Sequence, residues 1–98
     1  MATYVIFIRE GAITDPEAMA QYQSGNSGGG GSKPTGMKPL VVYGKMEAFE
    51  GEAPDGIVVL AFPDSQSARE WYYSEDYQSR VPFRQKAAPY RAVMVEGI

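Results

Sequence analysis

The chemistry open to this chain depends on tyrosine, arginine and carboxylate side chains, because its 98 residues include neither cysteine nor histidine. A thiolate nucleophile, a disulfide, a Cys-type zinc site and a histidine-based triad are therefore excluded. The carboxylates are scattered and show no EF-hand spacing, so we expect no metal site and no cofactor. Small-molecule chemistry would have to use hydroxyl donors, guanidinium groups or an activated carboxylate.

The segment Trp71–Tyr77, followed by Arg84, carries the most suggestive side chains. Its aromatic residues could line a pocket for a small aromatic or carbonyl compound, with tyrosine hydroxyls as donors. Arg84 could hold a ligand carboxylate through its two-pronged donor geometry. The alternatives are structural: Trp71 and Tyr72 would anchor a helix on a sheet, and Arg84 would form a salt bridge with Glu50, Glu75 or Asp76.

A second set of candidates lies earlier in the chain. Tyr43 and Glu47 alternate on one face of a predicted strand, so Glu47 is either a general base beside a cavity or an ordinary exposed charge. Tyr22 and Arg9 reach the mouth of the same cavity, or else face the sheet and the solvent respectively. Solvated surface positions are expected for Arg80 and Lys86. The catalytic candidates are thus Glu47, Tyr77 and Arg84, and the ligand-binding candidates are Tyr22, Tyr43, Trp71, Tyr72, Tyr77 and Arg84.

Short strands and helices must position these side chains. Runs of β-branched and aromatic residues predict strands at 3–9, 40–49, 57–62 and 90–95, with a bulge or close backbone approach at Gly44. The spacing of Thr14 and Glu17 predicts a capping box for a helix that ends near Gln23. A second helix should begin after Asp64 or Ser65, and a short one after Ser74. Pro82 should interrupt the chain before a connector over 83–88.

The resulting order βαββαβ predicts an α+β, ferredoxin-like domain. It should contain a four-stranded antiparallel sheet with two helices on one face. We expect one domain over residues 1–98, because a second core would not fit.

The predicted sheet has apolar side chains on both faces, although two helices cover only one. Leaving the other face in water would forgo roughly 5–10 kcal/mol at about 25 cal/mol per Å². We therefore expect a homodimer packed sheet on sheet.

Charge and hydropathy exclude other partners. The net charge of −3 argues against nucleic acid, and no apolar run approaches the ~18 residues that span a bilayer. We expect a cytoplasmic protein with no nucleic-acid or membrane partner.

The stretch over residues 24–36 contains Gly-Gly-Gly-Gly-Ser and nothing that can pack a core. We expect a flexible Gly/Ser-rich loop here. A Gly₄Ser run is typical of laboratory linkers, so an engineered replacement and a natural mobile loop are both open.

Several motifs resemble the family called domain of unknown function 1330, within the dimeric alpha–beta barrel superfamily. They are Lys38–Gly44, Glu50–Gly56, the run Trp-Tyr-x-Ser-x-x-Tyr over 71–77 with Arg84 seven residues later, Val95–Gly97, and Asp15-Pro16-Glu17 after the first strand. The resemblance implies a dimer with a small cleft between sheet and helices. It implies no single reaction, since relatives in the superfamily include cofactor-free monooxygenases, lactone isomerases, dehydratases and haem-degrading enzymes.

Three functions follow. The first is a cofactor-free isomerase, tautomerase or monooxygenase-like enzyme acting on a small organic ligand. The second is a non-catalytic ligand-binding or structural dimer. The third is an engineered scaffold or assembly component built on this fold.

Overall fold

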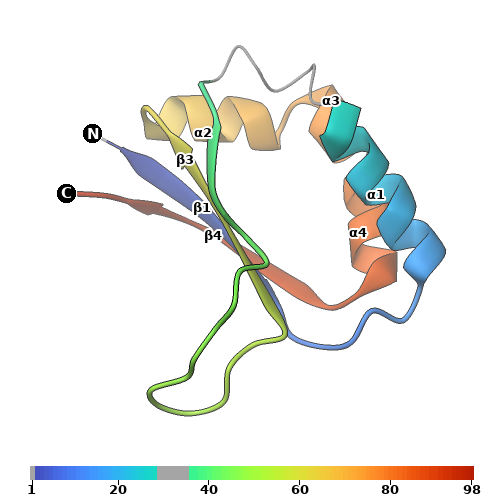
Figure 1. Cartoon of the computed structure of the whole chain (residues 1–98). Coiled ribbons are helices and arrows are strands. Elements are labelled where there is room, and N and C mark those ends of the chain that lie inside the picture. The colour runs from blue at the N-terminus through green and yellow to red at the C-terminus, as the bar shows by residue number, and fades with distance from the viewer. Residues whose placement is uncertain (1, 29–35) are drawn as a thin grey trace.

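The chain forms a twisted sheet with its helices on one side, as the computed structural model in Figure 1 shows. The structure describes residues 2–28 and 36–98, with side chains from 2–22 and 36–98. The elements in chain order are β1 (Thr3–Arg9), α1 (Pro16–Gly28), β2 (Lys38–Val42), β3 (Gly56–Phe62), α2 (Ser65–Tyr72), α3 (Glu75–Gln78), α4 (Val81–Ala87) and β4 (Tyr90–Glu96). The predicted strand at 40–49 is the one that differs clearly, and the second crossover holds three helices where two and a connector were expected.

The sheet has the strand order β2-β3-β1-β4 with every neighbouring pair antiparallel. Its centre is β1, which pairs with β3 on one side and with β4 on the other. The register places Arg9 opposite both Gly56 and Tyr90. These three residues therefore meet at one end of the sheet, beyond which β1 leads into α1.

The two faces of the sheet differ in burial. Thr3, Val5 and Phe7 of β1 are buried under the helices, together with Leu60 and Phe62 of β3. The alternate residues face away from the helices and are only half-buried or exposed. This open face consists of Tyr4, Ile6, Ile8, Ile57, Val59, Val93 and Val95. The predicted contrast between a covered and an uncovered apolar face is thus present.

The core is built from aromatic rings. Trp71 of α2 packs edge-on against Phe7, with ring centroids 6.2 Å apart, and lies 5.6 Å from Phe62. The Tyr77 ring lies 4.2 Å from that of Trp71. Ala18, Met19 and Tyr22 supply the buried side of α1, as their spacing predicts.

The N-terminus of α1 differs from the predicted capping box. Asp15, not Thr14, is the capping residue: its carboxylate accepts from the backbone N–H of Ala18 at 3.0 Å, and Pro16 is the first helical residue. Thr14 instead donates its hydroxyl to the carbonyl of Ala87 in α4. Asp takes the cap because it directly precedes the proline, whose fixed φ suits the first helical position.

The predicted end of this helix near Gln23 is also wrong, because α1 continues to Gly28. The first five residues of the expected Gly/Ser loop are thus helical, although glycine and serine have low helix propensity. The remainder of that loop, apart from Gly36, lies outside the described residues.

Caps in the second crossover follow the sequence more closely. Asp64 caps α2 by accepting from Ser67 N–H at 2.7 Å, and the Ser74 hydroxyl caps α3 by accepting from Tyr77 N–H at 3.2 Å. Pro82 does not interrupt the chain: it lies in the first turn of α4, where its missing N–H costs nothing. The expected connector is this helix.

Strand β2 ends at Val42, seven residues before the predicted end. Tyr43 has φ of 55°, a left-handed conformation that a strand cannot continue through. The irregular pairing lies between Pro39 and Val41, so the bulge predicted at Gly44 is misplaced. The segment 43–55 forms a long loop that extends away from the sheet (Figure 1). No helix among the described residues is long and apolar enough to cross a membrane.

Truncating a core ring should be costly. Phe62 is 2% exposed and Phe49, on the 43–55 loop, is 91% exposed. We expect Phe62→Ala to lower the free energy of unfolding by about 3–5 kcal/mol through lost burial and a cavity. Phe49→Ala should change it by less than about 0.5 kcal/mol. Urea denaturation at one fixed protein concentration checks both, and equal losses would contradict the assigned core.

Acid should weaken the two aspartate caps. Backbone N–H donation from Ala18 and Ser67 holds the pKa of the Asp15 and Asp64 carboxyls below their ordinary value. The unfolded chain therefore binds these protons first, so the caps stabilise the protein above about pH 4 and lose this effect as the pH falls further.

The double variant Asp15→Asn, Asp64→Asn should keep its helices, since Asn also caps. We expect its urea midpoint to fall less steeply than that of the parent between about pH 4 and pH 2. Asp55→Asn, on the exposed loop, is the control and should retain the parental slope. A double variant as acid-sensitive as the parent would refute this role of the caps.

Candidate functional site

Six arginine and tyrosine side chains gather at the end of the sheet where Arg9, Gly56 and Tyr90 meet. We call this set the Arg–Tyr cluster: Arg9, Tyr22, Tyr43, Tyr77, Arg84 and Tyr90. Two hydrogen bonds between phenols tie it together. The hydroxyls of Tyr22 and Tyr77 are 2.9 Å apart, and those of Tyr43 and Tyr90 are 2.5 Å apart.

Arg84 links the two phenol pairs. Its guanidinium carbon lies 5.3 Å from the centroid of the Phe7 ring and 5.4 Å from that of Tyr90, and Phe7 in turn contacts Tyr77. The residue is only 4% exposed, and its Nε has no hydrogen-bond partner. A buried guanidinium N–H without an acceptor is uncommon and destabilising.

The salt bridge considered for Arg84 does not form. Glu50, Glu75 and Asp76 make no ion pair with it within the described chain, and Asp76 pairs with Arg80 at 3.5 Å instead. The first α4 turn carries no acidic residue either. The contacts of the Arg84 guanidinium within the described chain are thus with the rings of Phe7 and Tyr90 and not with a carboxylate.

Arg9 occupies the other side of the cluster. Its guanidinium carbon lies 5.6 Å from the Tyr43 ring centroid, and one Nη donates to the backbone carbonyl of Asp55 at 2.9 Å. Its Nε is buried and unpartnered, as in Arg84. Two cations thus flank the Tyr43–Tyr90 pair, one packed on each ring.

Tyr43 enters the cluster because of its unusual backbone. With φ of 55°, it turns the chain at the end of β2 so that its ring packs over Gly56. A Cβ at Gly56 would lie 2.7 Å from Cδ1 of that ring, so only glycine fits there. A positive φ in a non-glycine residue costs of order 1–3 kcal/mol, and such strain gathers at functional sites.

Two phenols of the cluster, those of Tyr43 and Tyr77, stay protonated. Burial is the main cause that raises the pKa of Tyr43, and its hydrogen bond with Tyr90 adds to this. Burial likewise raises the pKa of Tyr77, which is 0% exposed, and the interaction with Tyr22 raises it further. These hydroxyls are therefore hydrogen-bond donors near neutral pH, not proton acceptors.

The other predicted site residues lie elsewhere. Trp71 is in the core, as the anchoring interpretation expects, and Glu47 is exposed on the 43–55 loop. Glu47 thus lacks the burial on which its role as a general base depended. The expected surface position is right for Lys86 and wrong for Arg80, which is buried over the Tyr77 ring.

Tyr90 is the cluster member that the sequence analysis missed. It begins the last strand, and only the antiparallel pairing of that strand with β1 brings it opposite Arg9. An aromatic residue at the start of a strand that pairs with the end of β1 is a signal that could have suggested it.

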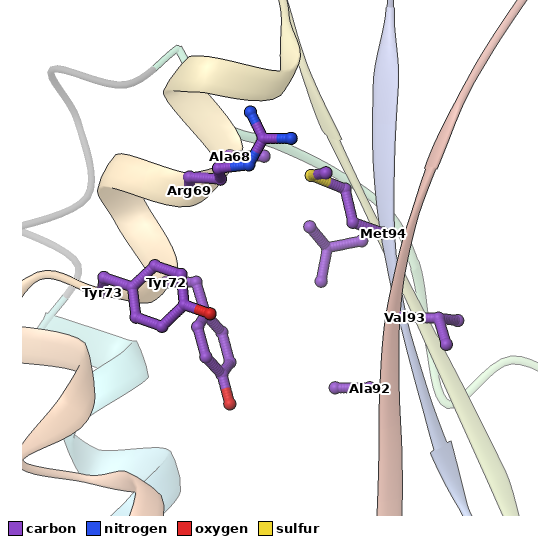
Figure 2. Close-up of a pocket in the computed structure, with 8 residues that line it drawn as sticks. Ala68, Arg69, Tyr72, Tyr73, Ala92, Val93 and Met94 are labelled. Carbon is purple, nitrogen blue, oxygen red and sulfur yellow. The ribbon is translucent and has the colours of Figure 1, made fainter.

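A separate groove of about 300 Å³ lies between α2 and β4 (Figure 2). Tyr72 and Tyr73 form one wall, while Ala92 and Met94 point toward them from β4 and Val93 points away. The floor is apolar, and Arg69 contributes the one charged group of the lining. Tyr72, a predicted ligand-binding residue, therefore belongs to this groove and not to the Arg–Tyr cluster.

No group of three or more carboxylates among the described residues could hold a metal ion. The donors of the Arg–Tyr cluster are cationic or neutral, which suits an oxygen ligand of negative or partial negative charge.

Gly56→Ala should displace the Tyr43 ring, because the added methyl group would overlap it. We expect a loss of about 1–3 kcal/mol in unfolding free energy and a Tyr43 phenol that ionises closer to its ordinary pKa of about 10. Gly44→Ala, whose Cβ would meet only Val41 at 3.7 Å, is the matched control.

Measurement of tyrosine absorbance as a function of pH tests the predicted effect of Gly56→Ala on the pKa of the Tyr43 phenol. The folded parent should keep Tyr43 and Tyr77 protonated above pH 10, since the pKa of each is raised. Its stability should be complete below about pH 10 and fall as the pH rises further, because the unfolded chain releases these protons first. Identical titrations of Gly56→Ala and the parent would contradict the packing described.

Solved structures with the same arrangement of elements support the fold. A dimeric ferredoxin-like protein of unknown function from Jannaschia sp. CCS1 matches with TM-score 0.71 and 11% identity over 99% of this chain and 100% of that chain. A protein of unknown function from Rhodopseudomonas palustris matches with TM-score 0.70 and 15% identity over 99% and 82%. These matches confirm the ferredoxin-like fold.

A third structure, from Nitrosomonas europaea, is described as a "putative antibiotic biosynthesis monooxygenase"; it matches with TM-score 0.55 and 7% identity over 99% of this chain and 89% of that chain. A comparison with curated protein sequences found no match. The family model for the domain of unknown function DUF1330 matches residues 2–98, and the chain therefore belongs to the DUF1330 family.

Proposed function

We propose that this protein is a homodimer in which each protomer binds a small organic molecule through an oxygen atom at the Arg–Tyr cluster. The observation that carries this proposal is a surplus of O–H donors in two phenol pairs, one buried and one half-buried. Each phenol pair contains two O–H groups and uses one of them to bond the other oxygen. The second O–H of each pair has no acceptor among the described residues.

The unpartnered Nε of Arg84 adds a third donor. No carboxylate within the described chain pairs with that guanidinium. The oxygen atoms of a ligand would supply acceptors for these donors, and the aromatic rings of Phe7 and Tyr90 beside Arg84 suit the apolar body of a small organic compound.

The chemistry of such a site is electrophilic. Protonated phenols and a guanidinium group donate to an oxygen and stabilise negative charge that develops on it. Proton abstraction needs an acceptor, and the cluster has none. Binding and polarisation of a carbonyl group are therefore the activity that this geometry supports best.

A second candidate is cofactor-free conversion of the bound compound. The same donors would stabilise an enolate oxygen, which is common to isomerisation and to cofactor-free oxygenation. The structural neighbour from Nitrosomonas europaea, described as a monooxygenase, favours this class. Turnover would then require a base from outside the cluster.

The dimer follows from the open face of the sheet. Its side chains are apolar and uncovered in one protomer, including Val93 and Val95 at 48% and 49% exposure. A second copy of the face would cover them, at about 25 cal/mol per Å² of buried apolar surface. The similar protein from Jannaschia sp. CCS1, described as dimeric, supports this arrangement.

Binding is tested with a panel of small aromatic and alicyclic carbonyl compounds, using thermal shift and native mass spectrometry. We expect at least one member to bind, and Tyr43→Phe or Tyr90→Phe to weaken it roughly tenfold by removing a donor. Tyr73→Phe, at an exposed position directly after the end of α2, is the control and should bind like the parent. A panel with no binder would overturn the proposed site.

The dimer is tested by light scattering on the full chain. We expect the mass of two protomers for the parent and of one for Val59→Lys, which places a charge on the open face. Tyr73→Lys, directly after the end of α2, should remain dimeric. A folded monomeric parent would rule out sheet-on-sheet association.

A further inference from the structure

We infer that the ligand of the Arg–Tyr cluster is a small organic carboxylate, held between Arg9 and Arg84. This inference rests on the proposed function only in taking the cluster to be a ligand site. What it adds is the charge of the ligand, which follows from a different observation: the cluster contains two cations and no anion.

The ion pairs of the described chain leave both cations unmatched. Asp15 pairs with Lys86, Asp76 with Arg80 and Glu10 with Arg91. Neither Arg9 nor Arg84 takes part in any of them. The carbonyl of Asp55 is the one acceptor recorded for the Arg9 side chain in the described part, and a neutral carbonyl does not compensate a charge.

The burial of Arg84 makes the lack of a paired anion energetically unfavourable. Arg84 is more than nine-tenths buried, and its Nε faces no acceptor. Cation–π contacts with Phe7 and Tyr90 are weaker than the hydration that a buried guanidinium loses. An anion in the site would restore the missing interaction, so the free protein holds a cation prepared for one.

The geometry favours a carboxylate in particular. Arg9 packs on Tyr43 and Arg84 on Tyr90, while the hydroxyls of these two tyrosines bond each other. Each of the two guanidinium groups thus packs on one ring of the same hydrogen-bonded phenol pair. A planar carboxylate offers two oxygens and about four acceptor positions to such a set, whereas a neutral carbonyl offers one oxygen.

The surroundings argue against a free inorganic anion. The Phe7 ring lies beside Arg84, and the Tyr43 ring covers Gly56. Contact between these rings and the hydrocarbon part of a ligand would bury apolar surface, which is favourable. A hydrated phosphate has no such apolar surface to bury. An aromatic or alicyclic monocarboxylate fits both the charge and the walls.

Benzoate and benzamide form the test, because they share shape and differ in charge. Isothermal titration of the full chain should show benzoate binding at least about tenfold more tightly than benzamide, and weakening as salt is added. Inorganic phosphate at the same ionic strength should bind more weakly than benzoate.

Variants locate the effect. Arg9→Gln should reduce benzoate affinity about tenfold and leave benzamide affinity unchanged, because it removes one of the two cations of the cluster from a half-buried position. Arg84→Lys keeps the positive charge but loses the two-pronged donor geometry of the guanidinium group. It should therefore also weaken benzoate binding. Arg69→Gln, in the groove between α2 and β4, should leave both affinities at the parental value.

The outcomes separate the two proposals. Equal affinities for benzamide and benzoate would contradict the inference that the ligand is a carboxylate. The proposal of a ligand site at the cluster would remain. If phosphate bound as tightly as benzoate, the result would indicate an inorganic anion as the ligand and contradict the organic carboxylate. Failure of benzoate, benzamide and the whole carbonyl panel would remove both proposals.

Discussion

The packing of the buried Tyr77 ring is the interaction on which the rest of this structure depends. Its ring is fully buried and packs against Trp71 of α2, Phe7 of β1 and Tyr22 of α1. One side chain thereby joins the sheet to both crossovers. Because α4 follows Tyr77 after three residues, the same contact determines where Arg84 meets the sheet. The core and the Arg–Tyr cluster are therefore not independent parts.

Stability and the proposed ligand binding act against each other at the cluster. A left-handed Tyr43, two unpartnered guanidinium N–H groups and a buried cation all destabilise the folded protomer. Nothing in the packing of the core requires them, since the aromatic rings beneath are already in contact. Local departures of this kind, within an otherwise consistent fold, are expected at sites that bind something.

The sequence predicts much of the fold and less of the site, for a physical reason. Alternating apolar residues and short-range caps such as Asp64 depend on neighbours in the chain, so the strand order and α2 are predictable. The cluster depends on pairing across the sheet, which brings Tyr90 opposite Arg9. It also depends on the backbone of Tyr43, where a positive φ ends a strand that side-chain pattern alone extends to residue 49.

Strand β4 connects the two proposed interfaces. Side chains alternate along it, so Tyr90 turns toward the helices while Val93 and Val95 lie on the open face. Arg91 follows Tyr90 and lies on the open face. It forms an ion pair with Glu10, just beyond the end of β1. Any shift of β4 that accompanies packing of two open faces would also move Tyr90, and with it the phenol pair between the two arginines. The proposed dimer surface and the proposed ligand site thus lie on opposite faces of one strand.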